Sequence, residues 1–416
     1  MNIGIIGSGI SGVTCARLLH DHHTFTLYES RDRPGGHIHT VDVQVGETTY
    51  PVDTGFIVFN NRTYPRFQEI LEDLDVEYQP TEMSFSVRCE NSGLEYNGHS
   101  INSLFAQRSN LFSARFHRLW IDILRFNRDA HKWLQHSKEN LTLGEFIKKK
   151  SYSDWFVDKY LLPMGAAIWS SSLEEVSRFP ARHMFRFFDH HGLLQIRNRP
   201  QWYSFPRGSR SYLRALISPW KDRLRTNTPV RSVHRGNDKV TLKTDGNTIK
   251  HDAVVFATHS DQALDILENP TREEQKILGA ISYHKNEAYL HTDSSILPSR
   301  KTARASWNVY IPGSNHPRPV VTYYMNILQN FKCEQDICVS LNAGEYINSD
   351  SIIDRFTYYH PGYSSESDRA RSRWEEINGN NNTFYAGAYW LDGFHEDGVQ
   401  SAYRVVNSLD ASLTNE

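Results

Sequence analysis

The fold of this protein is decided close to the start of the chain, by the stretch IGIIGSGISG at Ile3–Gly12. Its first four residues have the apolar character of a short buried strand, and residues 7–12 follow with the glycine spacing G-x-G-x-x-G. Residues 13–20 then predict a helix, and residues 24–29 predict a second strand. A strand, this glycine turn, a helix and a strand within about 30 residues indicate a dinucleotide-binding unit.

Each glycine of this turn has its own physical task. Gly7 makes the tight turn, Gly9 lets the backbone approach a pyrophosphate, and Gly12 lets the helix lie close to the strand. The helix N-terminus then offers free N–H groups and the positive end of its dipole to the phosphates. Glu29 ends the second strand, where its carboxylate can accept hydrogen bonds from ribose hydroxyls and would repel the 2′-phosphate of NADP.

Segments further along the chain favour FAD over NAD as the dinucleotide. Residues 31–37 hold a pair of glycines flanked by basic residues, which can form a second loop around the diphosphate. Residues 52–56 indicate a strand that ends in a glycine, at the distance where a flavin ring would lie. Residues 383–388 indicate a strand that closes on a glycine, and residues 400–409 a helix whose N-terminus suits the negative charge of a reduced flavin.

The composition excludes several classes of protein. The chain has 416 residues with 46 Lys and Arg against 48 Asp and Glu, so its net charge of −2 gives no general attraction to nucleic acid or to an anionic membrane. Its mean hydropathy of −0.57 and the lack of a long apolar window argue against a membrane-spanning protein. The segment after Met1 carries no signal-peptide pattern and the four cysteines are scattered, so we expect a cytoplasmic protein with reduced thiols.

Aromatic residues are abundant, with 9 Trp, 21 Tyr and 21 Phe on a chain that is only 39% hydrophobic. Such rings either line a cavity or pack a core. Their concentration between residues 105 and 205 favours a cavity.

Motifs in a characteristic order run through the whole chain. They are Gly7, Gly9, Gly12, Glu29, Asp32–Gly36, Phe205–Ser209, Pro229, Val230, Val254–Thr258, Ala386 and Gly387. In these residues the chain resembles the flavin-containing amine oxidase superfamily, which also holds protoporphyrinogen oxidase and the carotenoid desaturases. Residues 51–60, 83–87 and 393–398 are similar to a bacterial subgroup of NAD/FAD-binding proteins that resemble the desaturase of furan fatty acid synthesis, an enzyme of methylated acyl chains.

The resemblance implies an α/β fold in which a Rossmann-type FAD-binding domain is interleaved with an α+β substrate domain. Residues 1–60, 200–262 and 380–416 would form the FAD-binding domain, and residues 61–199 and 263–379 the substrate-binding domain. No cysteine stands in an evident attachment context, so we expect non-covalent FAD. The expected FAD contacts are Gly7, Gly9, Ile10, Ser11, Gly12, Glu29, Ser30, Arg31, Gly35, Gly36, His37, Thr54, Gly55, Phe56, Val230, Ala257, Gly387, Glu396, Asp397, Gly398 and Val399.

At one of these positions the chain departs from the superfamily. The residue after the paired glycines is arginine in most members, and here it is His37. An imidazole can still donate a hydrogen bond, but in its neutral form it carries no fixed charge.

The resemblance also indicates candidates for catalysis, because some members use a lysine near flavin N5. The corresponding strand contains Lys285 and Asn286, which would point to opposite faces, so only one of them can face the ring. We favour Asn286 and keep Lys285 as the alternative. His395 precedes the expected flavin helix, and Tyr389 stands where amine oxidases place a ring beside their substrate.

These observations predict an FAD-dependent oxidoreductase that takes a hydride from a C–H bond of an unsaturated or methylated fatty acyl chain, with oxygen reoxidising the flavin. Oxidation of an amine is the alternative among enzymes, and a binding protein on the same fold, like the GDP-dissociation inhibitors, is the alternative outside them. An NAD dehydrogenase would leave residues 387–399 unexplained. No metal site is expected, because adjacent histidines such as His22 and His23 point to opposite faces of a strand.

Residues 101–136 differ from the neutral average, with six basic residues against two acidic ones and large rings between them. A membrane-surface helix would use the rings and the positive charge to contact lipid. A helix of the protein core would instead bury the rings and leave the arginines in water. The sequence keeps both interpretations open, so peripheral membrane contact is one expected partner beside a small-molecule or lipid substrate.

Overall fold

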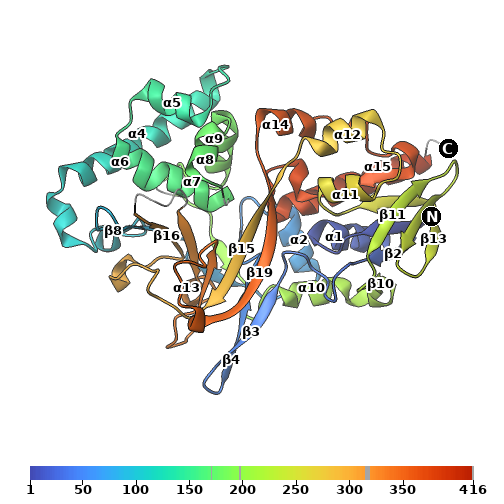
Figure 1. Cartoon of the computed structure of the whole chain (residues 1–416), viewed down its shortest axis with the longest axis horizontal. Coiled ribbons are helices and arrows are strands. Elements are labelled where there is room, and N and C mark those ends of the chain that lie inside the picture. The colour runs from blue at the N-terminus through green and yellow to red at the C-terminus, as the bar shows by residue number, and fades with distance from the viewer. Residues whose placement is uncertain (170, 196–197, 314–318, 415–416) are drawn as a thin grey trace.

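Strand β1 (Asn2–Ile6) lies in the middle of a five-stranded parallel sheet with the order β10–β2–β1–β14–β20. The computed structural model describes residues 1–169, 171–195, 198–313 and 319–414. The other strands of this sheet are β2 (Thr24–Tyr28), β10 (Leu224–Arg225), β14 (Ala253–Phe256) and β20 (Thr383–Tyr385). The sheet therefore joins three distant parts of the chain (Figure 1).

Two helices with their N-termini side by side belong to this sheet. Helix α1 (Ile10–Leu19) begins three residues before the predicted start, directly after Gly9, whose carbonyl accepts the amide of Val13 at 3.0 Å. Helix α15 (His395–Thr414) begins five residues before the predicted start, because Asp397 accepts the amide of Phe394 and so closes the first turn. The two helices pack against each other along their length.

The second large layer is a seven-stranded mixed sheet with the order β19–β15–β18–β17–β16–β7–β8, in which only β16 and β7 are parallel neighbours. Its strands are β7 (Phe85–Cys89), β8 (Leu94–Asn97), β15 (Tyr283–His291), β16 (Trp307–Ile311), β17 (Val320–Tyr324), β18 (Cys338–Leu341) and β19 (Ile352–Pro361). The predicted fold class, a parallel dinucleotide-binding sheet interleaved with a mixed α+β layer, is confirmed. The domain limits themselves stay a prediction.

A group of helices adjoins the β7–β8–β16 end of the mixed sheet (Figure 1). They are α3 (Ile101–Leu104), α4 (Ala114–His136), α5 (Leu143–Lys150), α6 (Asp154–Phe156), α7 (Leu162–Trp169), α8 (Leu173–Arg178) and α9 (Ala181–His190). Helix α6 runs on through a π-helical turn at Val157–Leu161 into α7, because Pro163 has no amide hydrogen for the regular α-helical bond.

The rings of this helical region form a packed core, which differs from the cavity that their concentration favoured. Phe126 makes edge-to-face contacts with Phe146 and Phe185, and all three side chains are fully buried. Phe156 and Phe116 are fully buried as well. Edge-to-face packing satisfies the ring quadrupoles without leaving space for a ligand.

Smaller elements complete the fold. A long hairpin of β3 (Thr40–Val45) and β4 (Thr48–Asp53) extends from the molecule (Figure 1). A small sheet has the order β5–β9–β6, and a third one the order β11–β12–β13. Their bounds are β5 (Phe59–Asn60), β6 (Gln79–Thr81), β9 (Trp202–Ser204), β11 (Val230–Arg235), β12 (Val240–Thr244) and β13 (Thr248–His251). The remaining helices are α2 (Pro65–Asp73), α10 (Arg210–Ile217), α11 (Ser260–Ile266), α12 (Arg272–Gly279), α13 (Met325–Leu328) and α14 (Ser365–Arg371).

Candidate cofactor and active site

The glycine turn between β1 and α1 shows which of its glycines the protein itself requires. A Cβ atom on Gly12 would lie 1.9 Å from the carbonyl oxygen of Gly7, and one on Gly7 would lie 2.7 Å from the carbonyl oxygen of Ala257. Gly7 also has a φ of +99°. A Cβ on Gly9 would meet no protein atom within 4 Å. The space beside Gly9 is therefore free for a ligand that approaches the backbone, which is the fit expected for a dinucleotide pyrophosphate.

The loop with the paired glycines lies directly on this turn. The amide of Gly35 donates to the carbonyl oxygen of Ser8 at 3.0 Å, and a Cβ on Gly36 would lie 3.3 Å from the Cα of Gly9. Ile10 and Ser11 begin α1 beneath the same loop. The structure thus brings the two predicted diphosphate loops together.

Glu29 follows the end of β2 beside the glycine turn and is only 8% exposed. One carboxylate oxygen accepts the amide of Ser8 at 3.1 Å, and the other accepts the amide of Arg31 at 2.9 Å. The hydroxyls of Ser8 and Ser30 also donate to this carboxylate, at 2.5 Å and 3.3 Å, so ribose hydroxyls would take the place of these rotatable donors at its roughly four lone-pair positions. Ser30 is exposed next to Glu29. The amide of Thr228 donates to the backbone carbonyl of Glu29 at 2.8 Å, and this bond brings Val230, another predicted FAD contact, close to Glu29.

His37 lies where the glycine loop meets the substrate layer. Its carbonyl oxygen accepts the amide of Phe56 at 2.8 Å and would lie 2.2 Å from a Cβ on Gly55, so this close backbone contact requires a glycine. It also explains why β4 ends at Asp53, earlier than the strand predicted for 52–56. Next to it, the hydroxyl of Thr54 lies 2.9 Å from that of Tyr358.

The His37 ring itself is neutral and has an unused polar atom. It stacks on Tyr358 with ring centroids 4.8 Å apart, and its Nε2 is buried without a hydrogen-bond partner among the described residues. Burial and the neighbouring His360 hold the pKa of His37 well below its ordinary value. A buried nitrogen without a partner in the protein is free to bond with a bound ligand.

Strands β15 and β19 present their inner face to His37. Asn286 of β15 is 1% exposed, and its amide nitrogen lies 3.1 Å from Nδ1 of His360. Its carbonyl oxygen accepts from Asn342 at 2.8 Å. Lys285 lies on the outer face of the same strand, exposed, with its Nζ 3.2 Å from Glu287. The two candidates therefore occupy opposite faces, and Asn286 is the one that joins the histidine cluster.

The residues predicted near the N-terminus of α15 have clear packing roles. The ring of His395 stacks on that of Phe56 with ring centroids 3.6 Å apart, and the Nε2 of His395 lies 2.6 Å from the hydroxyl of Tyr212. Burial lowers the pKa of His395 well below its ordinary value. Glu396 accepts the amide of Phe67 at 2.9 Å and thereby caps the N-terminus of α2. Burial raises the pKa of Glu396.

The remaining predicted contacts pack where α15 meets α1 and the end of β20. A Cβ on Gly398 would lie 2.6 Å from Cγ2 of Ile10, so this glycine permits close helix packing. Asp397 is the capping residue of α15, and burial raises its pKa well above the ordinary value. The predicted contacts Gly387 and Val399 are buried. A Cβ on Gly387 would lie 2.1 Å from the ring of Tyr389, which is 3% exposed.

Two groups of residues in this region were not predicted from the sequence. Tyr358 and His360 lie on the inner face of β19, where the alternation of residues 356, 358 and 360 is the available signal. Asp53 is fully buried and accepts the amide of Ser209 at 2.8 Å and the side-chain amide of Gln329 at 3.1 Å. Burial raises the pKa of Asp53 to about 7. These bonds fix the β4 strand that leads into Thr54.

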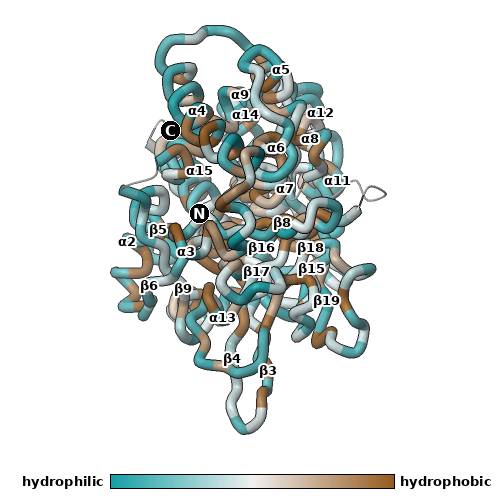
Figure 2. Tube along the Cα trace, turned by 90° about the vertical axis from the view of Figure 1, so that its left-hand side faces the viewer, coloured by the Kyte–Doolittle hydropathy of each residue, from teal (hydrophilic) through white to brown (hydrophobic). Residues whose placement is uncertain are grey.

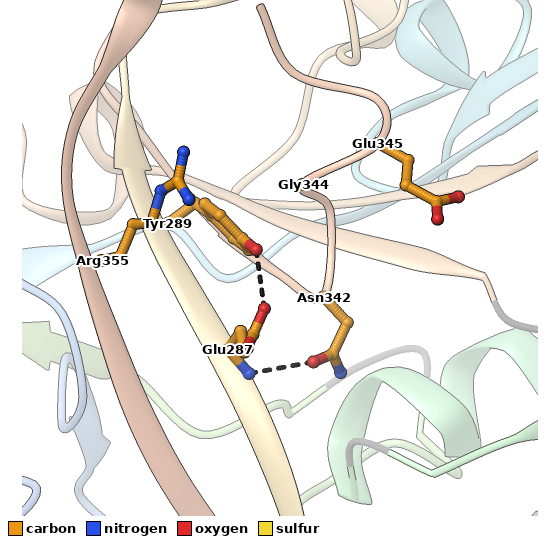
Figure 3. A pocket seen from close by; sticks show the side chains of 6 residues that line it. All are labelled: Glu287, Tyr289, Asn342, Gly344, Glu345 and Arg355. Atoms are coloured by element: carbon orange, nitrogen blue, oxygen red, sulfur yellow. Dashed lines mark hydrogen bonds between the residues drawn. The ribbon is translucent and has the colours of Figure 1, made fainter. Parts of the chain in front are cut away.

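An open pocket of about 340 Å³ lies on the opposite face of β15 (Figure 3). It is lined by Glu287, Tyr289, Asn342, Gly344, Glu345 and Arg355. Its side chains are mostly charged, and Tyr289 donates to Glu287 at 2.7 Å. Because it faces away from His37, it is separate from the candidate cofactor site.

Comparison with known proteins identifies the family. The model of flavin-containing amine oxidoreductases matches residues 10–320, which is more than half of the chain. The comparison with curated proteins found no match. The chain belongs to the flavin-containing amine oxidoreductase family and is an FAD-dependent oxidoreductase.

Solved structures show the same fold over nearly the whole length. A fatty acid isomerase from P. acnes that produces CLA has a TM-score of 0.69 at 16% identity, and the alignment covers 97% of both chains. A putative protoporphyrinogen oxidase from Exiguobacterium sp. has a TM-score of 0.69 at 14% identity, and the alignment covers 99% of both chains. Cyclohexylamine oxidase from Brevibacterium oxydans has a TM-score of 0.69 at 13% identity, again with 99% of both chains covered. At these identities the likeness describes the fold.

Proposed function

We propose that this protein oxidises a C–H bond of an uncharged apolar chain, such as an unsaturated or methylated fatty acyl chain, with non-covalently bound FAD. FAD supplies a two-electron oxidant that takes up a hydride, and oxygen regenerates it. The observation that carries the proposal is the uncharged face formed by the buried side chain of Asn286 and the half-buried rings of His37 and His360.

The protein's own residues would hold the cofactor through backbone groups and one carboxylate. The turn at Gly9 and the loop at Gly36 would receive the diphosphate, and Glu29 the ribose. The N-terminus of α15, which lies beside the N-terminus of α1, would add a second positive dipole end. The buried Nε2 of His37 would bond with the cofactor or the substrate beside it.

The inner face of β15 and β19 is suited to an uncharged substrate. Burial lowers the pKa of His360 to about 4, so its imidazole is neutral near pH 7. After burial, the groups that act on the pKa of His37 and His360 are other histidines and an arginine, with no carboxylate among the leading ones. A substrate ammonium group would need an anionic partner in such a buried place.

A role of Asn286 at the reacting carbon follows from the same geometry. Its side chain is held by His360 on one side and Asn342 on the other, so its position is fixed before a substrate arrives. Its exposure of only 1% keeps bulk water away from this side chain. Lys285, on the exposed face, remains the less favoured candidate.

Amine oxidation is the second candidate, and one contact favours it. The carboxylate of Glu175 lies 3.9 Å from Nδ1 of His284, whose side chain shares the inner face of β15 with Asn286. That carboxylate is the anionic partner that an ammonium substrate would use. The solved structures include both an isomerase of fatty acids and an oxidase of cyclohexylamine, so the fold alone leaves both substrates open.

The experiment is an anaerobic titration of the purified yellow protein. Heat or acid denaturation should release the flavin into the supernatant, since we expect no covalent link. Unsaturated and methylated acyl lipids should then bleach the flavin absorbance in the native protein, whereas amines of similar size should leave it unchanged. Bleaching by amines alone, with its loss in Glu175→Gln, would assign the protein to amine oxidation instead.

A further inference from the structure

Exposed apolar side chains gather in one short segment of the molecule. Among the described residues, eight large hydrophobic side chains are exposed, and five of them lie between residues 101 and 124. Their exposed fractions are 79% for Ile101, 44% for Leu111, 92% for Phe112, 55% for Ile121 and 50% for Leu124. We call these five residues the α3–α4 patch. Single exposed apolar residues are ordinary on a protein surface, but such a group marks an interaction site.

Helix α4 separates its buried face from this patch. At about 100° per residue, the outward side chains Arg118, Ile121, Leu124, Arg128 and Lys132 fall within an arc of about 120°. The opposite side buries Phe116, Phe126 and Trp133. Of the rings in residues 101–136, Phe116, Phe126 and Trp133 are therefore core residues, whereas Phe112 lies on the outer surface together with aliphatic side chains.

Positive charge surrounds the apolar side chains. Arg108, Arg115, Arg128 and Lys132 are exposed in the same segment. The acidic Asp122 is fully buried and accepts from Arg125 at 2.8 Å and from Arg118 at 3.2 Å, so its charge is neutralised inside the protein. Asp129 is half-buried, with its carboxylate near Arg125 and Arg128. The outer surface formed by the α3–α4 patch and its neighbouring basic side chains is therefore both apolar and positively charged.

We propose that the α3–α4 patch docks onto the surface of a phospholipid bilayer that contains anionic lipid. Phe112 and its aliphatic neighbours would enter the boundary between headgroups and acyl chains, and the basic side chains would contact the phosphates. The contact is peripheral, because no helix in the described part of the chain is long and apolar enough to cross a bilayer. The patch lies at the end of the molecule that carries α3 and α4, which Figure 2 turns toward the viewer.

The interior beneath the patch connects it with the candidate active site. Phe116 and Trp120 of α4 belong to a hydrophobic cluster that also includes Trp307 and Tyr323. The latter two also pack against the neighbouring cluster that holds Tyr358, next to His37. Packed apolar side chains therefore extend from beneath the patch to the face beside His37, which would suit an acyl chain taken from a bilayer. This link rests on the proposed function, whereas the docking does not.

The test is flotation of the intact protein with vesicles made of equal amounts of phosphatidylcholine and phosphatidylglycerol. At low salt the protein should float with these vesicles, and it should stay below with pure phosphatidylcholine vesicles or in high salt, which screens the charges. Phe112→Ser combined with Ile121→Ser should weaken binding by about tenfold or more. The matched control is Ile353→Ser, which removes an exposed isoleucine on β19 and should bind like the natural chain.

Charge is tested separately by Arg115→Glu with Arg128→Glu, which should abolish the preference for anionic vesicles. All these side chains are exposed, so retention of bound flavin should confirm that each variant is folded, and lipid binding is measured without any turnover. Failure of the natural protein to float, or equal flotation of the Phe112 and Ile121 variant, would overturn the proposal. A dimer that the same variant converts to a monomer, without vesicle binding, would assign the patch to a second copy of the chain and overturn it as well.

Discussion

Asn286 of β15 lies directly opposite Tyr358 of β19, so both side chains lie on the sheet face that meets His37. This pairing places the adjacent residues Asn286 and Lys285 on opposite faces of the sheet, with Asn286 toward His37. Lys285 is paired with Tyr359, which is exposed on the outer face. The polar side chain that the substrate layer offers to the glycine loop is therefore a fixed, uncharged amide.

Replacing Asn286 by Ala should slow flavin reduction by the substrate by about tenfold or more, because a preorganised polar group at the reacting centre is lost. Lys285→Ala is the matched control on the neighbouring position and should change the rate little. Rapid mixing without oxygen measures both. A large effect of the lysine variant with none of the asparagine variant would reverse the assignment of the inner face.

The glycine turn gives a prediction that separates ligand binding from folding. Gly9→Ala should change the free energy of unfolding of the cofactor-free protein by less than about 1 kcal/mol, because its Cβ meets no protein atom. It should nevertheless weaken FAD binding by about tenfold, because the methyl group occupies the space beside the backbone. Gly12→Ala should destabilise the fold by more than about 2 kcal/mol, since its Cβ would overlap the Gly7 carbonyl. Thermal melts and FAD titrations distinguish the two; equal FAD affinity in Gly9→Ala would exclude this site for the diphosphate.

The neutral histidines predict a pH dependence of stability. The folded-state pKa of His360 is lowered to about 4, whereas an unfolded His has about 6.5. Stability from its neutral form is therefore complete above about pH 6.5 and is lost as the pH falls toward about 4, because the unfolded chain binds the proton first. Between about pH 8 and pH 5, His360→Gln should lose about 2 kcal/mol less than the natural chain in urea unfolding. Identical losses would mean that folding does not lower the pKa of His360.

The buried carboxylate of Asp53 should matter for stability more than for chemistry. It accepts hydrogen bonds from the Ser209 amide, the Ser209 hydroxyl and the Thr40 hydroxyl. In Asp53→Asn one acceptor oxygen becomes an NH₂ group, whose hydrogens would face these donors and could not accept from them. We expect a loss of about 2 kcal/mol in the free energy of unfolding. Asp42→Asn, which removes an exposed ion pair between the same hairpin and Arg210 of α10, should cost less than about 1 kcal/mol. Denaturant melts compare the two variants, and equal losses would contradict a special role of the buried bonds.

The parts that could be predicted from sequence are those set by local chain geometry. The β1–α1 turn follows from glycine spacing within ten residues. The inner face of β15 could not be fixed, because it depends on pairing with β19, some seventy residues away. The same holds for Tyr358 and His360, whose position beside His37 arises from tertiary contacts. The rings of α4 have a regular spacing, but which side of the helix would be buried depended on Phe146 and Phe185 elsewhere in the chain.

Anaerobic mixing with two substrates of the same carbon skeleton tests the proposed chemistry most directly. One would be an unsaturated fatty acyl chain, and the other the corresponding amine. The neutral face of His37, Asn286 and His360 predicts that the acyl chain bleaches the bound flavin and that the amine does not. Bleaching by the amine, with none by the acyl chain, would contradict the account.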